Sequence, residues 1–218
     1  MLDNSVLKDV LYGEFARIGK SLSSPKRLEI LDLLSQSPKS VETLANDTEM
    51  TVANVSKHLQ TLYHAKLVTF KKKGNYVIYE LADEAVVDFM NCLRSLSEKQ
   101  LVKVQQIKEE FLNHQDGIEG ISLAELNKRM EIGEILLIDV RPKEEYEVAH
   151  IPGAISIPLQ ELEENLSAFP SHYDVVAYCR GPYCVMSVKA VELLTAKGFN
   201  AFRLENSVHD WQKFRQES

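Results

Sequence analysis

Cys179 and Cys184, five positions apart, are the residues of this sequence best placed to do chemistry. An apolar run at residues 175–177 predicts a buried strand before Cys179, and the apolar spacing from Ser187 onward predicts a helix. A loop between a strand and a helix directs backbone N–H groups and the positive end of the helix dipole at one point, which lowers a thiol pKa and favours a bound anion. The pattern predicts a reactive thiol at Cys179; the alternative is an inert thiol at the end of a strand.

The elements that would position Cys179 alternate between strands and helices. Residues 134–141 (EILLIDVR) indicate a buried strand that ends in an acid and a base, and residues 150–155 indicate a turn and a short strand. Helical spacing precedes them at residues 123–130. This alternation predicts an α/β unit with a mostly parallel sheet, at whose carboxyl edge both Asp139 and Cys179 would lie.

Residues 118–218 resemble a single rhodanese domain. The motifs that carry the resemblance follow one another in the expected order: LIDVR at 137–141, EEY at 144–146, HIPGA at 150–154, YCR at 178–180, and LE at 204–205 with Trp211. The resemblance implies a rhodanese-like fold in which Cys179 accepts a sulfane sulfur and carries it as a persulfide. A rhodanese-type sulfurtransferase that moves this sulfur to a thiol or to cyanide is therefore one expected activity.

The loop after Cys179 departs from the rhodanese pattern in its length. Sulfurtransferases of that family usually have a six-residue loop, whereas here the predicted loop runs from Cys179 to Met186 and would form a wider cradle. A longer loop resembles those of related phosphatases and arsenate reductases, but their phosphate-binding arginine is absent from residues 184–187. Phosphatase or arsenate reductase activity is therefore a third and weaker hypothesis.

Cys184 is the unusual element of this loop, because it places a second thiol five positions after Cys179. Such a thiol can attack a persulfide or a sulfenate on Cys179 and close a disulfide or polysulfide bridge, which would store a signal. The alternative is that Cys184 only fills a small apolar gap at the start of the helix. Among the neighbouring polar residues, Arg180 could neutralise an anionic donor such as thiosulfate or polysulfide. Asp139 either touches the substrate or forms a structural ion pair with Arg141.

The first half of the chain predicts a mainly helical fold. Apolar spacing and capping residues indicate four helices, at residues 7–22, 25–34, 41–45 and 51–63. Two β-prone runs follow, at residues 67–73 and 76–81, and they are joined around Gly74-Asn75. This order predicts a winged helix-turn-helix with a β-hairpin as its wing.

Residues 25–31 (PKRLEIL) and 55–62 (VSKHLQTL) resemble the ArsR/SmtB family of bacterial repressors. Short polar side chains and lysines on the last helix and on the wing can approach base edges and phosphates, as the resemblance also implies. The residues expected at the DNA are Thr51, Ala53, Asn54, Ser56, Lys57, His58 and Gln60 on the helix, and Lys71, Lys72 and Lys73 on the wing. Taken singly, each pattern is also typical of a solvated helix face or a solvated lysine run.

The helix expected after the wing continues through residues 86–113 and would pair with its counterpart in a homodimer. We therefore expect three parts: a winged-helix DNA-binding and dimerisation domain at residues 1–97, a helical linker at 98–117 and the rhodanese-like domain at 118–218. Members of the ArsR/SmtB family often sense metals, but Asp88 and Cys92 alone cannot fill a tetrahedral zinc site. We expect neither a metal nor another cofactor.

Charge is divided unevenly along the chain. Residues 1–95 contain 12 basic and 12 acidic side chains, whereas residues 96–218 contain 13 and 20, so the whole net charge of -7 lies in the second half. A neutral first half can still carry a local basic patch for DNA, and an acidic second half would be repelled by phosphates. No run of about 18 apolar residues and no hydrophobic signal core occur, so we expect a cytoplasmic protein that does not contact a membrane.

Together these patterns predict a DNA-binding regulator, expected to repress from a pseudo-palindromic operator. Its rhodanese domain would sense reactive sulfur or oxidants through Cys179, with Cys184 as a resolving thiol. The alternative is a sulfurtransferase that the winged helix tethers to DNA. Both hypotheses use the same nucleophile, and turnover with thiosulfate distinguishes them.

Overall fold

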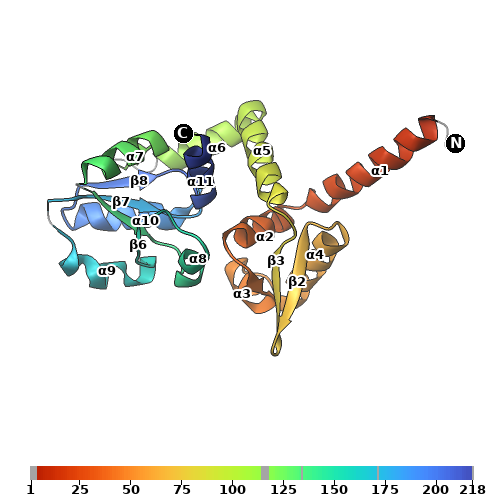
Figure 1. Ribbon diagram of the computed structural model, residues 1–218, viewed down its shortest axis with the longest axis horizontal. Coiled ribbons are helices and arrows are strands. Elements are labelled where there is room, and N and C mark those ends of the chain that lie inside the picture. The colour runs from red at the N-terminus through yellow and green to blue at the C-terminus, as the bar shows by residue number, and fades with distance from the viewer. Residues whose placement is uncertain (1–3, 114–117, 134, 171, 218) are drawn as a thin grey trace. The chain divides into compact units, whose positions relative to one another are not determined.

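The computed structural model describes residues 4–113, 118–133, 135–170 and 172–217. The chain divides into two compact units, one up to Gln100 and one from Leu101. Figure 1 labels the elements of both.

The first unit is a winged helix-turn-helix. Its helices and strands are α1 (Asn4–Leu22), α2 (Pro25–Gln36), β1 (Lys39–Ser40), α3 (Val41–Asp47), α4 (Val52–His64), β2 (Val68–Lys73), β3 (Tyr76–Leu81) and α5 (Ala85–Gln100). The three strands form an antiparallel sheet in the order β1-β3-β2. The mainly helical fold with a β-hairpin wing is confirmed.

Local capping signals set the start of two of these helices. The Ser40 hydroxyl accepts a hydrogen bond from the Thr43 N–H at 3.1 Å, and the Thr51 hydroxyl accepts one from the Asn54 N–H at 3.3 Å. Such side chains satisfy N–H groups that have no partner within the helix. Ser40 thus caps α3, and Thr51 caps α4, each one residue before the first helical residue.

The core of the first unit is formed by α2, α3 and α4. Val55, Leu59 and Leu62 form the apolar side of α4 and are fully buried. Ile30 and Leu44 of the neighbouring helices pack into the same cluster. Because this side of α4 faces inward, the polar side of the same helix is left for solvent or for a ligand.

The wing is a tight hairpin whose strands pair from Val68 opposite Leu81 to Lys73 opposite Tyr76. Gly74 has a φ of 61°, in the left-handed region that favours glycine. The short connection through Gly74 and Asn75 therefore turns without strain and leaves the lysine-rich end of β2 at the tip.

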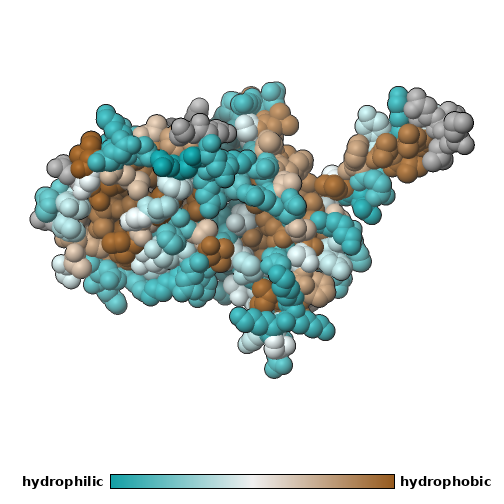
Figure 2. Space-filling view, viewed as in Figure 1, coloured by the Kyte–Doolittle hydropathy of each residue, from teal (hydrophilic) through white to brown (hydrophobic). Residues whose placement is uncertain are grey.

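Helix α1 carries an apolar side that nothing in its own chain covers among the described residues. Val10, Tyr12 and Phe15 are 60%, 68% and 63% exposed. Figure 2 shows apolar residues gathered along this helix. Exposed apolar area of this kind marks an interaction surface.

The long helix predicted over residues 86–113 is wrong in one respect, because it is two helices. Helix α5 ends at Gln100, and α6 (Val102–Asn113) begins after Leu101. The Leu101 carbonyl accepts hydrogen bonds from the N–H groups of Val104 and Gln105, so it serves as the start of a new helix. Neither proline nor glycine marks this break, and an apolar period that continues across it could not reveal it.

The second unit is an α/β domain built on a five-stranded sheet. After α6 its elements are β4 (Glu119–Ile121), α7 (Leu123–Ile132), β5 (Ile135–Asp139), α8 (Lys143–Val148), β6 (Ile155–Ser156), α9 (Leu162–Asn165), β7 (Asp174–Tyr178), α10 (Val185–Ala196), β8 (Ala201–Leu204) and α11 (Val208–Glu217). All neighbouring strands are parallel, in the order β4-β8-β7-β5-β6. The predicted α/β fold is confirmed.

The sheet separates two apolar cores. Val175 and Ala177 of β7 pack on one face with Val191 of α10, while Val176 and Tyr178 pack on the other face, where Trp211 of α11 also lies. Register places Asp139 opposite Tyr178, so β5 and β7 end at the same edge. That edge is where ligands collect in parallel α/β folds.

No helix in the described part of the chain is long and apolar enough to cross a membrane.

Candidate functional site

The loop between β7 and α10 is shorter than the sequence suggested. Strand β7 ends at Tyr178 and α10 begins at Val185, so the loop consists of the six residues 179–184. The prediction of a loop reaching Met186 is therefore wrong. Val185 and Met186 form the first turn of α10, and because Val185 is exposed, no apolar period signals that turn. This length removes the reason for likening the loop to those of phosphatases.

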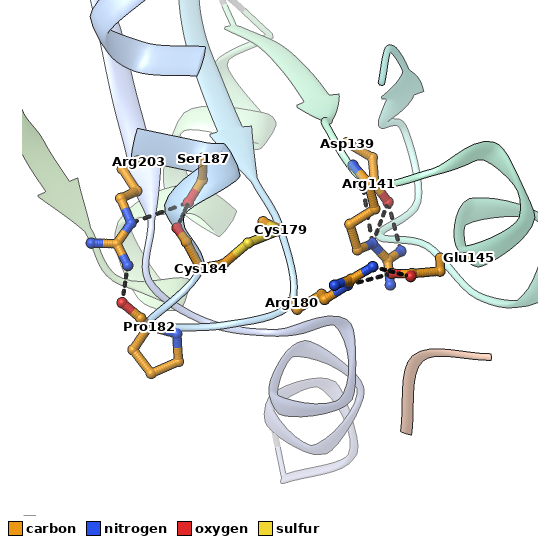
Figure 3. The surroundings of a disulfide bond; sticks show 9 residues. All are labelled: Asp139, Arg141, Glu145, Cys179, Arg180, Pro182, Cys184, Ser187 and Arg203. Carbon is orange, nitrogen blue, oxygen red and sulfur yellow. Dashed lines mark hydrogen bonds and ion pairs between the residues drawn. A yellow bond between two sulfur atoms is a disulfide. The ribbon is translucent and has the colours of Figure 1, made fainter. Parts of the chain in front are cut away.

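Cys179 and Cys184 are joined by a disulfide across this loop (Figure 3). Their Cα atoms are 6.2 Å apart. Cys179 is 1% exposed and belongs to the core beneath α10, and Cys184 is half-buried at the residue that precedes the helix. The bridge spans the whole loop, so its opening frees both ends of the loop at once.

Arg180 points away from the disulfide and toward α8 (Figure 3). Its guanidinium donates to both carboxylate oxygens of Glu145, at 3.0 and 2.5 Å, and Glu145 is fully buried. A two-point pair of this kind is strong and directional. The guanidinium that was expected to neutralise an anionic donor is thus held by a carboxylate in this structure.

Asp139 lies at the same edge and forms the ion pair with Arg141 that the sequence allowed. The Arg141 guanidinium donates to Asp139 Oδ2 at 2.6 Å and to the Ala149 carbonyl at 2.8 Å, and both charged side chains are buried. Burial works against the charge of Arg141, but the hydrogen bond and the charge of Asp139 raise its pKa above the ordinary value. Asp139 therefore fixes Arg141 and the turn after β5.

The residues expected at the DNA occupy the start and the polar side of α4. Ala53, Asn54, Lys57 and Gln60 are exposed, whereas Ser56 and His58 are half-buried. Thr51 is exposed, and its hydroxyl caps the helix. Burial and then the charges of Arg27 and Lys57 lower the pKa of His58 below its ordinary value.

The wing lysines are all exposed, but they differ in their surroundings. Lys71 forms an ion pair with Glu80 of β3 at 2.7 Å. Lys72 and Lys73 lie nearer the tip, where they pair in register with Val77 and Tyr76. The tip therefore offers positive charge that the Lys71 pair does not neutralise.

Comparison with known proteins agrees with both units. Residues 24–69 match the family described as bacterial regulatory protein, arsR family, and residues 122–214 match the rhodanese-like domain. The HTH-type transcriptional regulator Rv0324 of Mycobacterium tuberculosis is 38% identical over 212 residues, which cover 97% of this chain and 93% of that protein. The chain belongs to the ArsR family of transcriptional regulators. The similarity to that relative extends over both domains of this regulator.

Other relatives match one half of this ArsR-family regulator. The human thiosulfate:glutathione sulfurtransferase is 30% identical over 40% of this chain and 86% of its own length. A solution structure of a homodimeric winged helix-turn-helix domain from Mycobacterium bovis is 34% identical, covers 46% of this chain and 94% of that chain, and has a TM-score of 0.43.

Sequence reasoning missed one polar residue at the loop of the regulator. Arg203 in β8 is 1% exposed, and it donates to the Pro182 carbonyl and, at 3.2 Å, to the Ser187 hydroxyl. The available signal was a single charged residue inside the apolar strand Ala201–Leu204. Since successive residues of a strand face opposite sides, Arg203 had to point into the core that holds Cys179.

Proposed function

We propose that this ArsR-family regulator binds operator DNA as a homodimer in the cytoplasm and that its rhodanese-like domain controls the binding through Cys179 and Cys184. The observation that carries the proposal is the disulfide across the loop of residues 179–184. Disulfides in reducing compartments are usually transient and serve catalysis or redox sensing. A bridge between the expected nucleophile and a neighbouring thiol fits a sensor.

The chemistry follows from the two thiols. A Cys179 thiolate attacks a sulfane sulfur of a polysulfide and displaces the shorter polysulfide, which leaves a persulfide on Cys179. The Cys184 thiolate then attacks Cys179 Sγ, forms the disulfide and expels hydrosulfide. Two thiols are oxidised, and one sulfane sulfur is reduced to sulfide. A thiol reductant returns the loop to its open form.

The DNA side of the proposal rests on α4 and the wing. The exposed polar side of α4 suits base edges, and Lys72 and Lys73 at the wing tip suit phosphates. The uncovered apolar side of α1 suits a second copy of the chain, which would present two α4 helices to the two half-sites of a pseudo-palindromic operator. Because both half-sites must be met together, a small change within the dimer alters affinity strongly.

The two sites are connected along the chain through α5 and α6. A change in the loop can thus reach the winged helix by way of these helices and their junction at Leu101. Such coupling is a free energy shared between two sites, and about 1–3 kcal/mol changes affinity five- to 150-fold.

The test compares operator affinity of the reduced protein before and after treatment with polysulfide. Treatment of the wild type is expected to change affinity by about tenfold or more, and Cys179→Ser is expected to abolish the change. Cys92→Ser is the matched control, because Cys92 is the exposed free cysteine of α5 and should leave the response intact. A response that persists in Cys179→Ser would overturn the proposal.

A tethered sulfurtransferase is the second candidate, and the similarity to the human thiosulfate:glutathione sulfurtransferase favours it. This enzyme would need Cys179 as a free thiolate in every cycle, whereas the bridge to Cys184 removes it. Steady-state turnover of thiosulfate with glutathione as acceptor distinguishes the two. Turnover below about 1 per second lies under the usual enzymatic range and supports sensing.

A further inference from the structure

Arg203 lies under the disulfide loop although it belongs to another strand. It pairs in register with Ala177 of β7, two residues before Cys179, and its side chain is buried. Figure 3 shows its guanidinium on the Cys184 side of the loop, opposite the side on which Arg180 reaches Glu145.

The contacts of Arg203 fall on both sides of Cys184 in the sequence. The guanidinium donates to the Pro182 carbonyl before Cys184 and to the Ser187 hydroxyl after it. Ser187 in turn donates to the Cys184 carbonyl at 3.1 Å. Arg203 and Ser187 thus tie the second half of the loop to β8, while the Arg180–Glu145 pair ties the first half to α8.

A buried arginine is a costly way to fill this position. Burial lowers the pKa of Arg203 from its ordinary value, with the charge of Glu205 opposing the effect. A cation beside the first turn of a helix also meets the positive end of the helix dipole. An apolar side chain would fill the space at lower cost, so what arginine adds is a fork of directed donors for the loop.

We propose that Arg203 is the positioning residue for Cys184. It holds the Pro182 carbonyl directly and the Cys184 carbonyl through the Ser187 hydroxyl. In this way it keeps the Cys184 thiol against Cys179 and so sets the effective concentration at which the internal disulfide closes. Fixed geometry of this kind raises effective molarity by orders of magnitude. This role rests on the thiol chemistry proposed above and deepens it, because it makes the loop ready to close before any signal arrives.

The quantity to measure is the equilibrium between the two cysteines and glutathione. A Cys179 thiolate attacks glutathione disulfide and releases one glutathione, and Cys184 then attacks Cys179 Sγ and releases the second. Two protein thiols are oxidised and one glutathione disulfide is reduced. The equilibrium constant has units of concentration and reports the effective concentration of Cys184 directly.

Arg203→Met is expected to lower this equilibrium constant by about tenfold or more. Arg203→Lys keeps the charge but loses the forked donors, and it is expected to lower the constant as much. Ser187→Ala removes the hydroxyl that joins Arg203 to the Cys184 carbonyl but leaves the contact of Arg203 with the Pro182 carbonyl. It serves as a milder variant if the arginine variants fold poorly, with an expected loss of about threefold. Arg129→Met is the matched control, because Arg129 stacks on Phe202 at 4.2 Å and lies outside the loop.

A second measurement separates positioning from damage to the fold. The alkylation rate of Cys179 is measured as a function of pH in Cys184→Ser and in the double variant Cys184→Ser, Arg203→Met. The two pH profiles are expected to be the same. Constants within twofold of wild type for Arg203→Met and Ser187→Ala overturn the proposal, as does full rescue by Arg203→Lys. All these measurements need no DNA, so a regulator whose operator affinity ignores the redox state would defeat the proposed function and leave the role of Arg203 standing.

Discussion

Arginines at the edge of the rhodanese-like sheet have different kinds of partner, and this decides what each contributes. Arg141 and Arg180 meet buried carboxylates, Asp139 and Glu145. Arg203 donates to a carbonyl of the loop and to a hydroxyl of the helix that follows it. Ion pairs with buried carboxylates lock a backbone turn, whereas the donors of Arg203 hold a loop that opens and closes in the proposed function.

Breaking the Asp139–Arg141 pair on one side is expected to be severe. Arg141→Met leaves a fully buried carboxylate without its guanidinium, which costs about 3–5 kcal/mol of unfolding free energy. Trp211, the single tryptophan of the chain, packs in the rhodanese-like unit, so its fluorescence during urea unfolding reports on that unit.

Lys143→Met is the control for this experiment. The Lys143–Glu161 pair is about half exposed, at 55% and 45% of the two side chains, and its loss is expected to cost less than about 1 kcal/mol. Equal losses for the two variants would show that the buried pair adds no special stability.

At the scale of elements, α1 is the helix whose apolar side is least covered by the rest of the described chain. Its apolar side is exposed along most of its length, from Val6 to Ile18. A helix that presents such a stripe gains its stability from packing, and by itself it is marginal in water. We therefore expect the stripe to pack against a second copy of the regulator, as in the homodimer proposed above.

Phe15→Glu is expected to weaken this dimer. A charge at the middle of the apolar side of α1 would have to be buried without a partner, so the dissociation constant should rise by about tenfold or more. Sedimentation equilibrium measures it. Asp9→Lys, on the polar side of the same helix, should leave association unchanged, and a Phe15→Glu protein that dimerises as tightly as wild type would exclude α1 from the interface.

At the scale of the whole molecule, the two units differ in net charge in a way that suits their proposed roles. The acidic excess lies entirely beyond residue 95, while the wing and α4 in the neutral half carry the lysines that suit phosphates. Contact with DNA is therefore expected to depend on a few local lysines rather than on the net charge of -7.

Replacing both Lys72 and Lys73 with glutamine is expected to weaken DNA binding about equally for all sequences. The affinity falls as salt rises, and each lost phosphate contact reduces the steepness of log affinity against log salt concentration by about 1. Titration of operator and unrelated DNA at several salt concentrations measures this slope. Lys128→Gln in α7 removes one charge from the acidic unit as a control, and an unchanged slope in the wing variant would show that the tip does not touch DNA.

Much of this architecture could be predicted from local signals. The side of α4 that carries Val55 and Leu59, the cap at Ser40 and the Gly74 turn all depend on residues within a few positions of one another. Short-range periodicity and capping do not depend on tertiary contacts, so they can be recognised before the fold is known. The motifs around Asp139 and Cys179 marked the edge of the sheet in the same way.

What only the tertiary structure decided were the partners of long side chains and the ends of helices without breakers. Glu145 is 35 positions from Arg180, and Arg203 is 21 positions from Pro182, so each pair depends on how β7, α8 and β8 pack. The start of α10 at Val185 and the break at Leu101 could not be predicted, because apolar periodicity does not show at which residue a helix begins or ends. The sequence by itself determined a winged helix, a rhodanese-like domain and two cysteines in one loop. The fold decided that the loop is six residues long, bridged, and held from beneath by Arg203, because those contacts form only when distant strands meet.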